Sequence, residues 1–194
     1  MSCAAIILAA GESRRMGRPK AFLPFREGTF LTSIAATLSA RCSPVTAVFG
    51  HDAQRLTVIA QQMGLRTIEN PHYALGMLTS LQTGLRTISP GTDTVLFTLV
   101  DHPAISLATV DILLASQALI AIPRFENKRG HPVLIRRPIM EEFLLEPASS
   151  KVRDVIDRHA AEIDYIDIGD PGICDDIDDP ALYAKLLARE AASV

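Results

Sequence analysis

The sequence contains no tryptophan, and aromatic residues make up only 5% of its 194 positions. Because hydrophobic residues still make up 48% of the chain, its core must be built mainly from leucine, isoleucine, valine and alanine. Charged residues amount to 21%, which is a globular composition and excludes a disordered chain. We expect one domain over residues 1–194, because this length suffices for a single substantial core.

Positive charge is not in excess, and long apolar runs are missing. The net charge of −3 argues against a nucleic-acid-binding surface. No apolar stretch is long enough to span a bilayer. The apolar residues 4–10 form a short run that a charged loop follows, which is typical of a buried strand and not of a signal peptide. We therefore expect a cytoplasmic protein that binds neither nucleic acid nor membranes.

Cysteine is scarce, with Cys3, Cys42 and Cys174 far apart in the sequence. The lack of a CxxC pair excludes a cysteine zinc site, and five scattered histidines do not form one either. The odd number and wide spacing predict three reduced thiols, as in most cytoplasmic proteins.

Strand and helix patterns alternate over the first hundred residues, and the remainder is less regular. We expect strands at residues 4–9, 45–50, 65–69 and 94–100, and helices at 29–41, 51–63, 78–88 and 106–116, with Ser106 as an N-cap. The later part predicts strands at 119–125, 132–136 and 165–168, and helices at 138–145, 152–161 and 180–191. This alternation indicates βαβ units, hence a single-domain, Rossmann-like, three-layer α/β/α fold with a mostly parallel sheet.

The loop after the first strand, residues 8–20 (LAAGESRRMGRPK), is strongly basic. Arginine donates in a fork that suits phosphate, and lysine adds a compact charge. Gly11 and Gly17 permit tight turns and close approach of N–H groups to an anion. A solvated basic loop is the alternative, but the direct join to a buried strand favours a triphosphate site. The spacing fits neither a Walker loop nor GxGxxG, so a dinucleotide site is not expected.

Asp101 follows the strongest expected strand, at the edge of the sheet where ligands bind in open α/β folds. Magnesium prefers such a carboxylate together with substrate phosphates. A helix-capping role is the alternative, but Ser106 is better placed to cap. A second acidic group, at residues 175–179, is a solvated turn or part of the same metal site.

The basic loop resembles the signature LAAGxSxRMGxxK of the MobA-like nucleotidyltransferases. Further segments resemble that family: Asn70-Pro71, Gly76, Ser80-Leu81, Asp101-His102-Pro103, residues 129–133 (RGHPV) and residues 176–180 (DIDDP). The resemblance extends from residue 4 to about residue 187. It implies an enzyme with the nucleotide-diphospho-sugar transferase type of fold.

The resemblance also implies roles for individual residues. The expected nucleotide-binding residues are Leu8, Ala9, Ala10, Gly11, Arg15, Lys20, Asn70, Gly76 and Ser80. Lys20, Arg15 and Asp101 are the expected catalytic residues, with the two cations on the β- and γ-phosphates. Mg²⁺ is the expected cofactor, with Asp101 as first ligand and Asp176 as second. His102, Arg129 and His131 are candidate contacts for the acceptor phosphate, with plain surface exposure as the alternative.

The tetrapeptide LAAG bears on the choice of nucleotide. Guanylyltransferases of the family typically show LAGG, and the cytidylyltransferases show LAAG. Ala10 therefore favours CTP as the nucleotide. The resemblance to the cytidylyltransferases then implies molybdopterin as the phosphorylated acceptor, and a molybdoenzyme or other cofactor-handling protein as a partner. Two alternatives stay open: a transferase for a sugar phosphate or another small phosphorylated acceptor, and a non-catalytic nucleotide-binding accessory protein.

Overall fold

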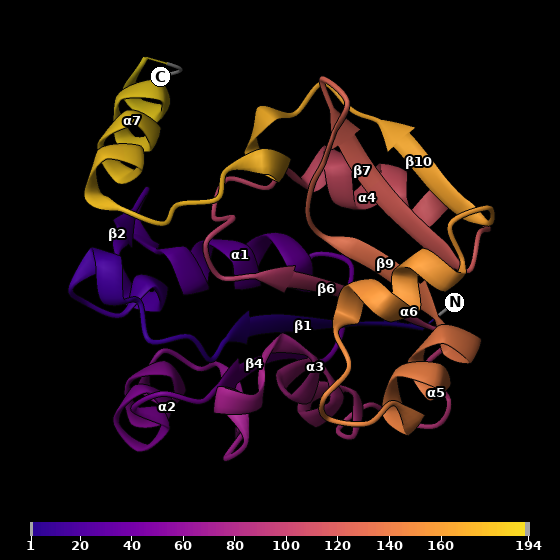
Figure 1. Cartoon of the computed structure of the whole chain (residues 1–194). Helices are drawn as coiled ribbons and strands as arrows, with labels where there is room; N and C mark the ends of the chain where they lie inside the picture. Colours follow the sequence, from indigo (N-terminus) through magenta and orange to yellow (C-terminus); the bar gives the residue numbers. More distant parts are fainter. Residues whose placement is uncertain (1, 193–194) are drawn as a thin grey trace.

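The apolar run near the start of the chain forms a central strand in the computed structural model, which describes residues 2–192 (Figure 1). This strand, β1 (Cys3–Ala9), is buried along its whole length. Its side chains alternate between two core clusters, with Ala5 and Ile7 in one and Ile6 and Leu8 in the other. A strand that is covered on both faces needs an uninterrupted apolar sequence, which explains this run.

The sheet has the strand order β10-β7-β9-β6-β1-β4-β5, and β8 pairs with β7. The other strands are β4 (Val45–Phe49), β5 (Arg66–Glu69), β6 (Thr94–Leu99), β7 (Ile120–Phe125), β8 (Lys128–Arg129), β9 (Val133–Arg136) and β10 (Ile163–Asp167). β4 and β6 flank β1 and run parallel to it, as expected from βαβ units. β9 runs antiparallel to both β6 and β7. The predicted mostly parallel sheet is therefore confirmed.

Helices cover both faces of the sheet, which confirms the three layers (Figure 1). One core cluster contains residues of α1 (Phe30–Ser39), α2 (Ala53–Gln62), α4 (Leu107–Ala115) and α7 (Pro180–Ala191). The other contains residues of α3 (Met77–Leu85), α5 (Arg137–Leu145) and α6 (Val152–Arg158). Within residues 2–192, no helix has the combination of length and apolar character that crossing a membrane requires.

Local signals in the sequence set several element boundaries. The Ser106 hydroxyl accepts a hydrogen bond of 3.1 Å from the Thr109 N–H, so the predicted N-cap of α4 is confirmed. Thr29 caps α1 through a reciprocal capping box with Thr32. Gly64, with φ of 77°, ends the α2 segment in the left-handed conformation that glycine adopts without steric cost.

Several short elements were not expected from the sequence. A hairpin of β2 (Pro24–Phe25) and β3 (Gly28–Thr29) precedes α1. The described part of the chain also contains four 3₁₀ turns: η1 (Arg14–Met16), η2 (Lys20–Phe22), η3 (Tyr73–Leu75) and η4 (Pro171–Cys174). Elements of two to four residues are too short to produce a periodic apolar pattern, so the sequence predicts only loops at these places.

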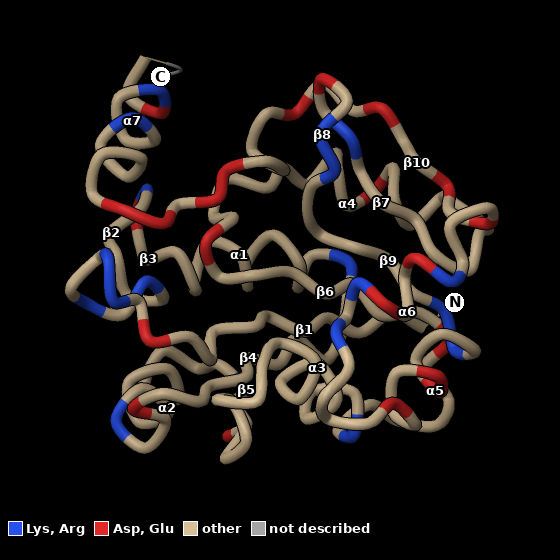
Figure 2. The backbone as a smooth tube through the Cα atoms, viewed as in Figure 1, with Lys and Arg blue, Asp and Glu red and all other residues tan. Residues whose placement is uncertain are grey.

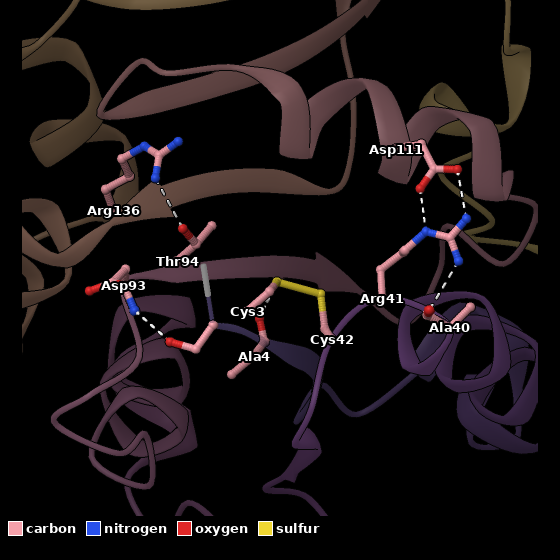
Figure 3. The surroundings of a disulfide bond; sticks show 10 residues. Cys3, Ala4, Ala40, Arg41, Cys42, Asp93, Thr94, Asp111 and Arg136 are labelled. Atoms are coloured by element: carbon pink, nitrogen blue, oxygen red, sulfur yellow. Dashed lines mark hydrogen bonds and ion pairs between the residues drawn. A yellow bond between two sulfur atoms is a disulfide. The ribbon is translucent and has the colours of Figure 1, made fainter.

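The prediction of three reduced thiols is wrong for two of them, because Cys3 and Cys42 form a disulfide (Figure 3). The turn before β4 runs beside the start of β1, where the Ser43 N–H donates to the Cys3 carbonyl at 2.8 Å. This places the two Cα atoms 4.7 Å apart, within disulfide range. The pair lies 39 residues apart in the sequence, and a separation of that size gives no pairing signal. Cys174 is a free thiol.

Candidate functional site

The loops that follow β1 and β6 meet at one edge of the sheet. Leu8 in β1 pairs directly with Leu99 in the neighbouring parallel strand β6, so both loops leave the sheet side by side. A cavity of about 560 Å³ opens between them, which is the size of a small-molecule site. Its lining includes nearly all predicted nucleotide-binding residues: Leu8, Ala9, Ala10, Gly11, Arg15, Lys20, Gly76 and Ser80. Asp101 and Asp178 line the same cavity.

Two left-handed residues shape the basic loop. Ser13 has φ of 53° and Gly17 has φ of 71°, and the short turn η1 lies between them. The Ser13 hydroxyl accepts a hydrogen bond of 3.2 Å from the Lys20 N–H, which ties the two ends of the loop together. As a result Lys20 is only 8% exposed, whereas the Arg15 side chain extends into solvent at the cavity mouth.

A group of three carboxylates lies beside the loop. The Ile177 N–H donates to the Asp101 carbonyl at 3.0 Å, so Asp176 and Asp178 flank the point where β6 ends. Carboxylate oxygens of Asp101, Asp176 and Asp178 lie within 4.8 Å of one another. Figure 2 shows this acidic stretch in red where the chain leads into α7. The structure thus brings the two predicted metal ligands together and adds Asp178, whose only sequence signal was membership of the acidic group.

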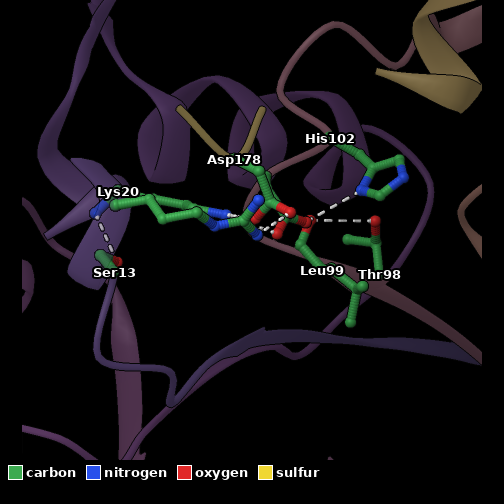
Figure 4. A network of polar contacts seen from close by, with 8 residues as sticks. Ser13, Lys20, Thr98, Leu99, His102 and Asp178 are labelled. Atoms are coloured by element: carbon green, nitrogen blue, oxygen red, sulfur yellow. Dashed lines mark hydrogen bonds and ion pairs between the residues drawn. The ribbon is translucent and has the colours of Figure 1, made fainter. Parts of the chain in front are cut away.

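Lys20 bridges two of these carboxylates (Figure 4). Its Nζ lies 3.0 Å from Asp101 Oδ2 and 2.5 Å from Asp178 Oδ1, and Asp178 also pairs with Arg15. Burial alone would lower the pKa of Lys20, but the two carboxylates outweigh it and raise that pKa. The hydrogen bond from Lys20 in turn lowers the pKa of Asp178. Both predicted phosphate-binding cations are therefore paired with carboxylates of this group, Lys20 with Asp101 and Asp178, and Arg15 with Asp178.

The surroundings shift the pKa values of Asp101 and Asp176 in opposite directions. Burial disfavours the Asp101 carboxylate, yet the hydrogen bond from His102 and the nearby Lys20 lower its pKa to about 2. Asp176 has no such partner, and partial burial together with the charges of Asp101 and Asp178 raises its pKa. Repulsion among closely spaced carboxylates is relieved by a cation, so this group has the charge and the oxygen ligands that a hard divalent metal requires.

His102 and His131 lie behind Asp101. His102 is buried, and its Nδ1 is 3.0 Å from Asp101 Oδ1. The His131 ring packs edge-on against His102 with centroids 4.6 Å apart, and its buried Nδ1 has no hydrogen-bond partner. Burial lowers the pKa of His131 to about 3, so this ring is neutral near pH 7.

Arg129, the third predicted acceptor contact, lies apart from these two rings. Its exposed guanidinium sits over the Tyr165 ring, 4.9 Å from the centroid, and 3.9 Å from an Asp157 oxygen. None of the three predicted acceptor residues lines the cavity.

Asn70 braces the cavity wall without lining it. Its buried amide donates to the hydroxyls of Thr79 and Ser80, each at 2.9 Å, and its carbonyl oxygen accepts from the His72 N–H. These contacts fix the start of α3, where Ser80 faces the cavity. Tyr73 lines the cavity as well, although no sequence pattern marked it.

Comparison with known proteins gives a family match over most of the chain. The family described as "MobA-like NTP transferase domain" matches residues 5–163. The molybdenum cofactor cytidylyltransferase of Escherichia coli (strain K12) is 30% identical over 171 residues, which cover 84% of this chain and 86% of that protein.

Two further matches carry other names. The nicotine blue oxidoreductase of Paenarthrobacter nicotinovorans is 30% identical over 196 residues, covering 94% of this chain and 95% of that protein. The crystal structure of Rv0371C from Mycobacterium tuberculosis H37Rv in complex with manganese superposes with a TM-score of 0.75 at 20% identity, covering 97% of this chain and 99% of that one. The last match concerns the fold alone.

Proposed function

Because this chain belongs to the MobA-like NTP transferase family and is a nucleotidyltransferase of that type, we propose that it transfers CMP from CTP to the phosphate of molybdopterin. The observation that carries this proposal is the cavity in which Lys20 and Arg15 of the basic loop face Asp101 and Asp178. Cations for a triphosphate and carboxylates for a metal are the two parts that nucleotidyl transfer requires.

The carboxylates favour Mg²⁺ as the metal of this enzyme. Asp101 and Asp176 would hold it, with Asp178 as a third oxygen donor once Lys20 has moved to the phosphates. The bound metal would neutralise charge on the α-phosphate and on the leaving pyrophosphate. The manganese in the related Rv0371C structure supports a divalent ion in this fold.

We assign the nucleotide to the cavity wall formed by β1 and α3. Leu8, Ala9, Ala10 and Gly11 face Gly76 and Ser80 across the space for base and ribose, and Asn70 holds Ser80 in place. Arg15 and Lys20 would bind the β- and γ-phosphates. The acceptor phosphate oxygen forms a bond to the α-phosphorus while the bond to pyrophosphate breaks, so no protein nucleophile is needed.

The residues predicted to bind the acceptor phosphate lie outside the cavity lining. Exposed Arg129 is the remaining candidate for this phosphate, because His102 and His131 are taken up in packing against Asp101 and each other. A sugar phosphate or another small phosphorylated compound is the alternative acceptor, and a non-catalytic accessory role is the alternative without chemistry.

The proposal is tested by incubating the protein with each of the four nucleoside triphosphates, Mg²⁺ and molybdopterin, and measuring pyrophosphate. We expect release with CTP that depends on the acceptor, and at least 10-fold less with Asp101→Asn. Release with a sugar phosphate in place of molybdopterin would support the second acceptor class. No release with any triphosphate would refute the enzyme assignment. A parallel assay for oxidation or reduction of nicotine blue tests the activity named for the Paenarthrobacter relative.

A further inference from the structure

The buried histidine pair next to Asp101 has no part in the mechanism described so far. We propose that His102 is a positioning residue, which orients the Asp101 carboxylate for the divalent metal, and that His131 holds the His102 ring in place. This inference rests on the proposed function only in the assumption that Asp101 binds a metal.

The hydrogen bond between His102 and Asp101 has a defined direction. Asp101 already accepts from the Lys20 ammonium at 3.0 Å, as a carboxylate does, and a carboxylate can only accept, so the imidazole Nδ1 carries the proton and donates. The bond of 3.0 Å engages Asp101 Oδ1, while Oδ2 faces Lys20. His102 thus fixes one oxygen, and the other lies against Lys20, which lines the cavity and also contacts Asp178. Residues that bind a metal ligand from behind in this way commonly tune metal affinity 10–100-fold.

His131 contacts His102 by ring packing, and its buried Nδ1 has no hydrogen-bond partner among the described residues. Its ring meets His102 edge-on at 4.6 Å and Phe97 at 6.2 Å, so His131 packs between these two rings. The backbone leaves it little freedom, because the His131 N–H donates to the Ile173 carbonyl at 2.9 Å and a Cβ on Gly130 would lie 2.5 Å from that same oxygen. Ile173 belongs to η4, which leads directly into Asp176 and Asp178. The packing that holds the two rings therefore continues into the segment that carries the other two carboxylates.

Two substitutions separate the hydrogen bond from the packing. His102→Phe keeps an aromatic ring against His131 but removes the donor. His102→Asn loses the ring but keeps an N–H close to the position of Nδ1. His159→Phe is the matched control, because His159 Nε2 lies 2.6 Å from Glu142 Oε2, outside the site.

The first measurement is Mn²⁺ binding without nucleotide, followed by electron paramagnetic resonance. We expect His102→Phe to weaken Mn²⁺ binding about 10–100-fold, and His102→Asn to stay within about 3-fold of the wild type. His159→Phe should lower the melting temperature without changing Mn²⁺ affinity. In turnover, His102→Phe should raise the KM for Mg²⁺ and leave kcat at saturating Mg²⁺ within a few-fold of the wild-type value. Equal Mn²⁺ affinity in the wild type and His102→Phe overturns the inference.

A second measurement covers the case in which His102→Phe does not fold. Nitrogen NMR of the wild type with ¹⁵N-labelled histidine should show a protonated His102 Nδ1, assigned by its loss in His102→Asn. A His102 Nδ1 without a proton would overturn the inference. If the wild type binds no Mn²⁺ but releases pyrophosphate without metal, the metal assignment and this inference both fail. If it binds Mn²⁺ and His102→Phe binds it equally, only this inference fails.

Discussion

Lys20 occupies the space between the carboxylates that we assign to the metal. With Nζ at 3.0 Å from Asp101 and 2.5 Å from Asp178, the ammonium group supplies the charge that a divalent ion would supply. Metal binding must therefore displace Lys20, and a triphosphate offers the displaced ammonium a new partner. Metal and triphosphate should for this reason bind with positive coupling, because each binding event frees the group that the other one needs.

We predict that Lys20→Met binds free Mn²⁺ more tightly than the wild type and binds CTP more weakly. The substitution keeps most of the side-chain length but removes the charge that competes for Asp101 and Asp178. Electron paramagnetic resonance of Mn²⁺ and calorimetry with CTP measure the two affinities. Lys185→Met, at an exposed position of α7, is the control and should change neither affinity. Weaker Mn²⁺ binding by Lys20→Met would show that Lys20 does not compete with the metal.

His131 predicts a pH dependence of stability. Its pKa falls to about 3 on folding because the ring is buried, whereas in the unfolded chain the pKa has its ordinary value of 6.5. Between these values the unfolded state binds more protons, so the free energy of unfolding decreases as the pH falls below 6.5. One such group changes the free energy of unfolding by at most about 1.4 kcal/mol per pH unit.

Urea unfolding at pH 7, 6 and 5 measures this slope. His131→Phe should make it shallower, because phenylalanine fills a similar space and does not titrate. His72→Phe, at an exposed position, serves as the control and should leave the slope unchanged. An unchanged slope in His131→Phe would mean that other groups cause the acid sensitivity.

At the site, the sequence motifs pointed to residues that line one cavity but not to the contacts between them. Lys20 and Asp101 were chosen from the motif and the strand end, and the structure places them in direct contact. Asp178 was not chosen, because nothing in a run of aspartates tells which of them faces the cavity. The orientation of His102 could not be predicted from the sequence either. Its burial depends on a tertiary contact, because the segment at 130–131 packs over it.

At the scale of elements, the close fit of α3 against the sheet depends on Gly84. A Cβ at this position would lie 2.8 Å from Ile6 Cγ2 and 3.2 Å from Val48 Cγ2, both on fully buried side chains. Glycine costs helix stability in the interior of α3, so its presence here is explained by the distance between helix and sheet.

We predict that Gly84→Ala lowers the free energy of unfolding by about 1–2 kcal/mol, because overpacking in the core outweighs the gain in helix propensity. Chemical denaturation measures the change. Gly91→Ala, where a Cβ would meet nothing within 4 Å, should leave stability unchanged or slightly raised. A Gly84→Ala protein as stable as the wild type would mean that α3 can shift away from β1 and β4.

Sequence patterns predicted well the elements that are long enough to show a continuous apolar run or a helical repeat. The strands at β1, β4 and β6 and the helix α7 agree with expectation to within one or two residues. The direction of β9 was not predictable, because strand direction depends on which edge the chain returns to and not on its residues. The disulfide partner of Cys3 was hidden for the same reason, since the β1–β4 pairing that brings Cys42 close is a tertiary contact.

At the scale of the molecule, the site joins the two ends of the chain. Lys20 and Asp178 are 158 residues apart in sequence, yet their side chains are in contact. The segment that carries Asp176 and Asp178 is held by the Asp101–Ile177 hydrogen bond, and α7 beyond it is anchored through Tyr183, which donates to the Pro24 carbonyl at 2.6 Å. A ligand that binds all three carboxylates should therefore stabilise the whole fold and not the loop alone.

We predict that Mn²⁺ raises the melting temperature of the wild type, and that removing the metal with EDTA reverses the rise. A ligand at 100 times its dissociation constant adds about 2.7 kcal/mol to the free energy of unfolding, which is easily measured by calorimetry.

Asp176→Asn should remove most of the Mn²⁺-induced rise, because it deletes one of the three carboxylates. Asp175→Asn is the matched control: Asp175 pairs with Arg189, so this variant should melt earlier but keep the full Mn²⁺-induced rise. If both variants kept the rise, Asp176 would not be a metal ligand. If both lost it, the metal would act through the packing of α7 and not through the three carboxylates.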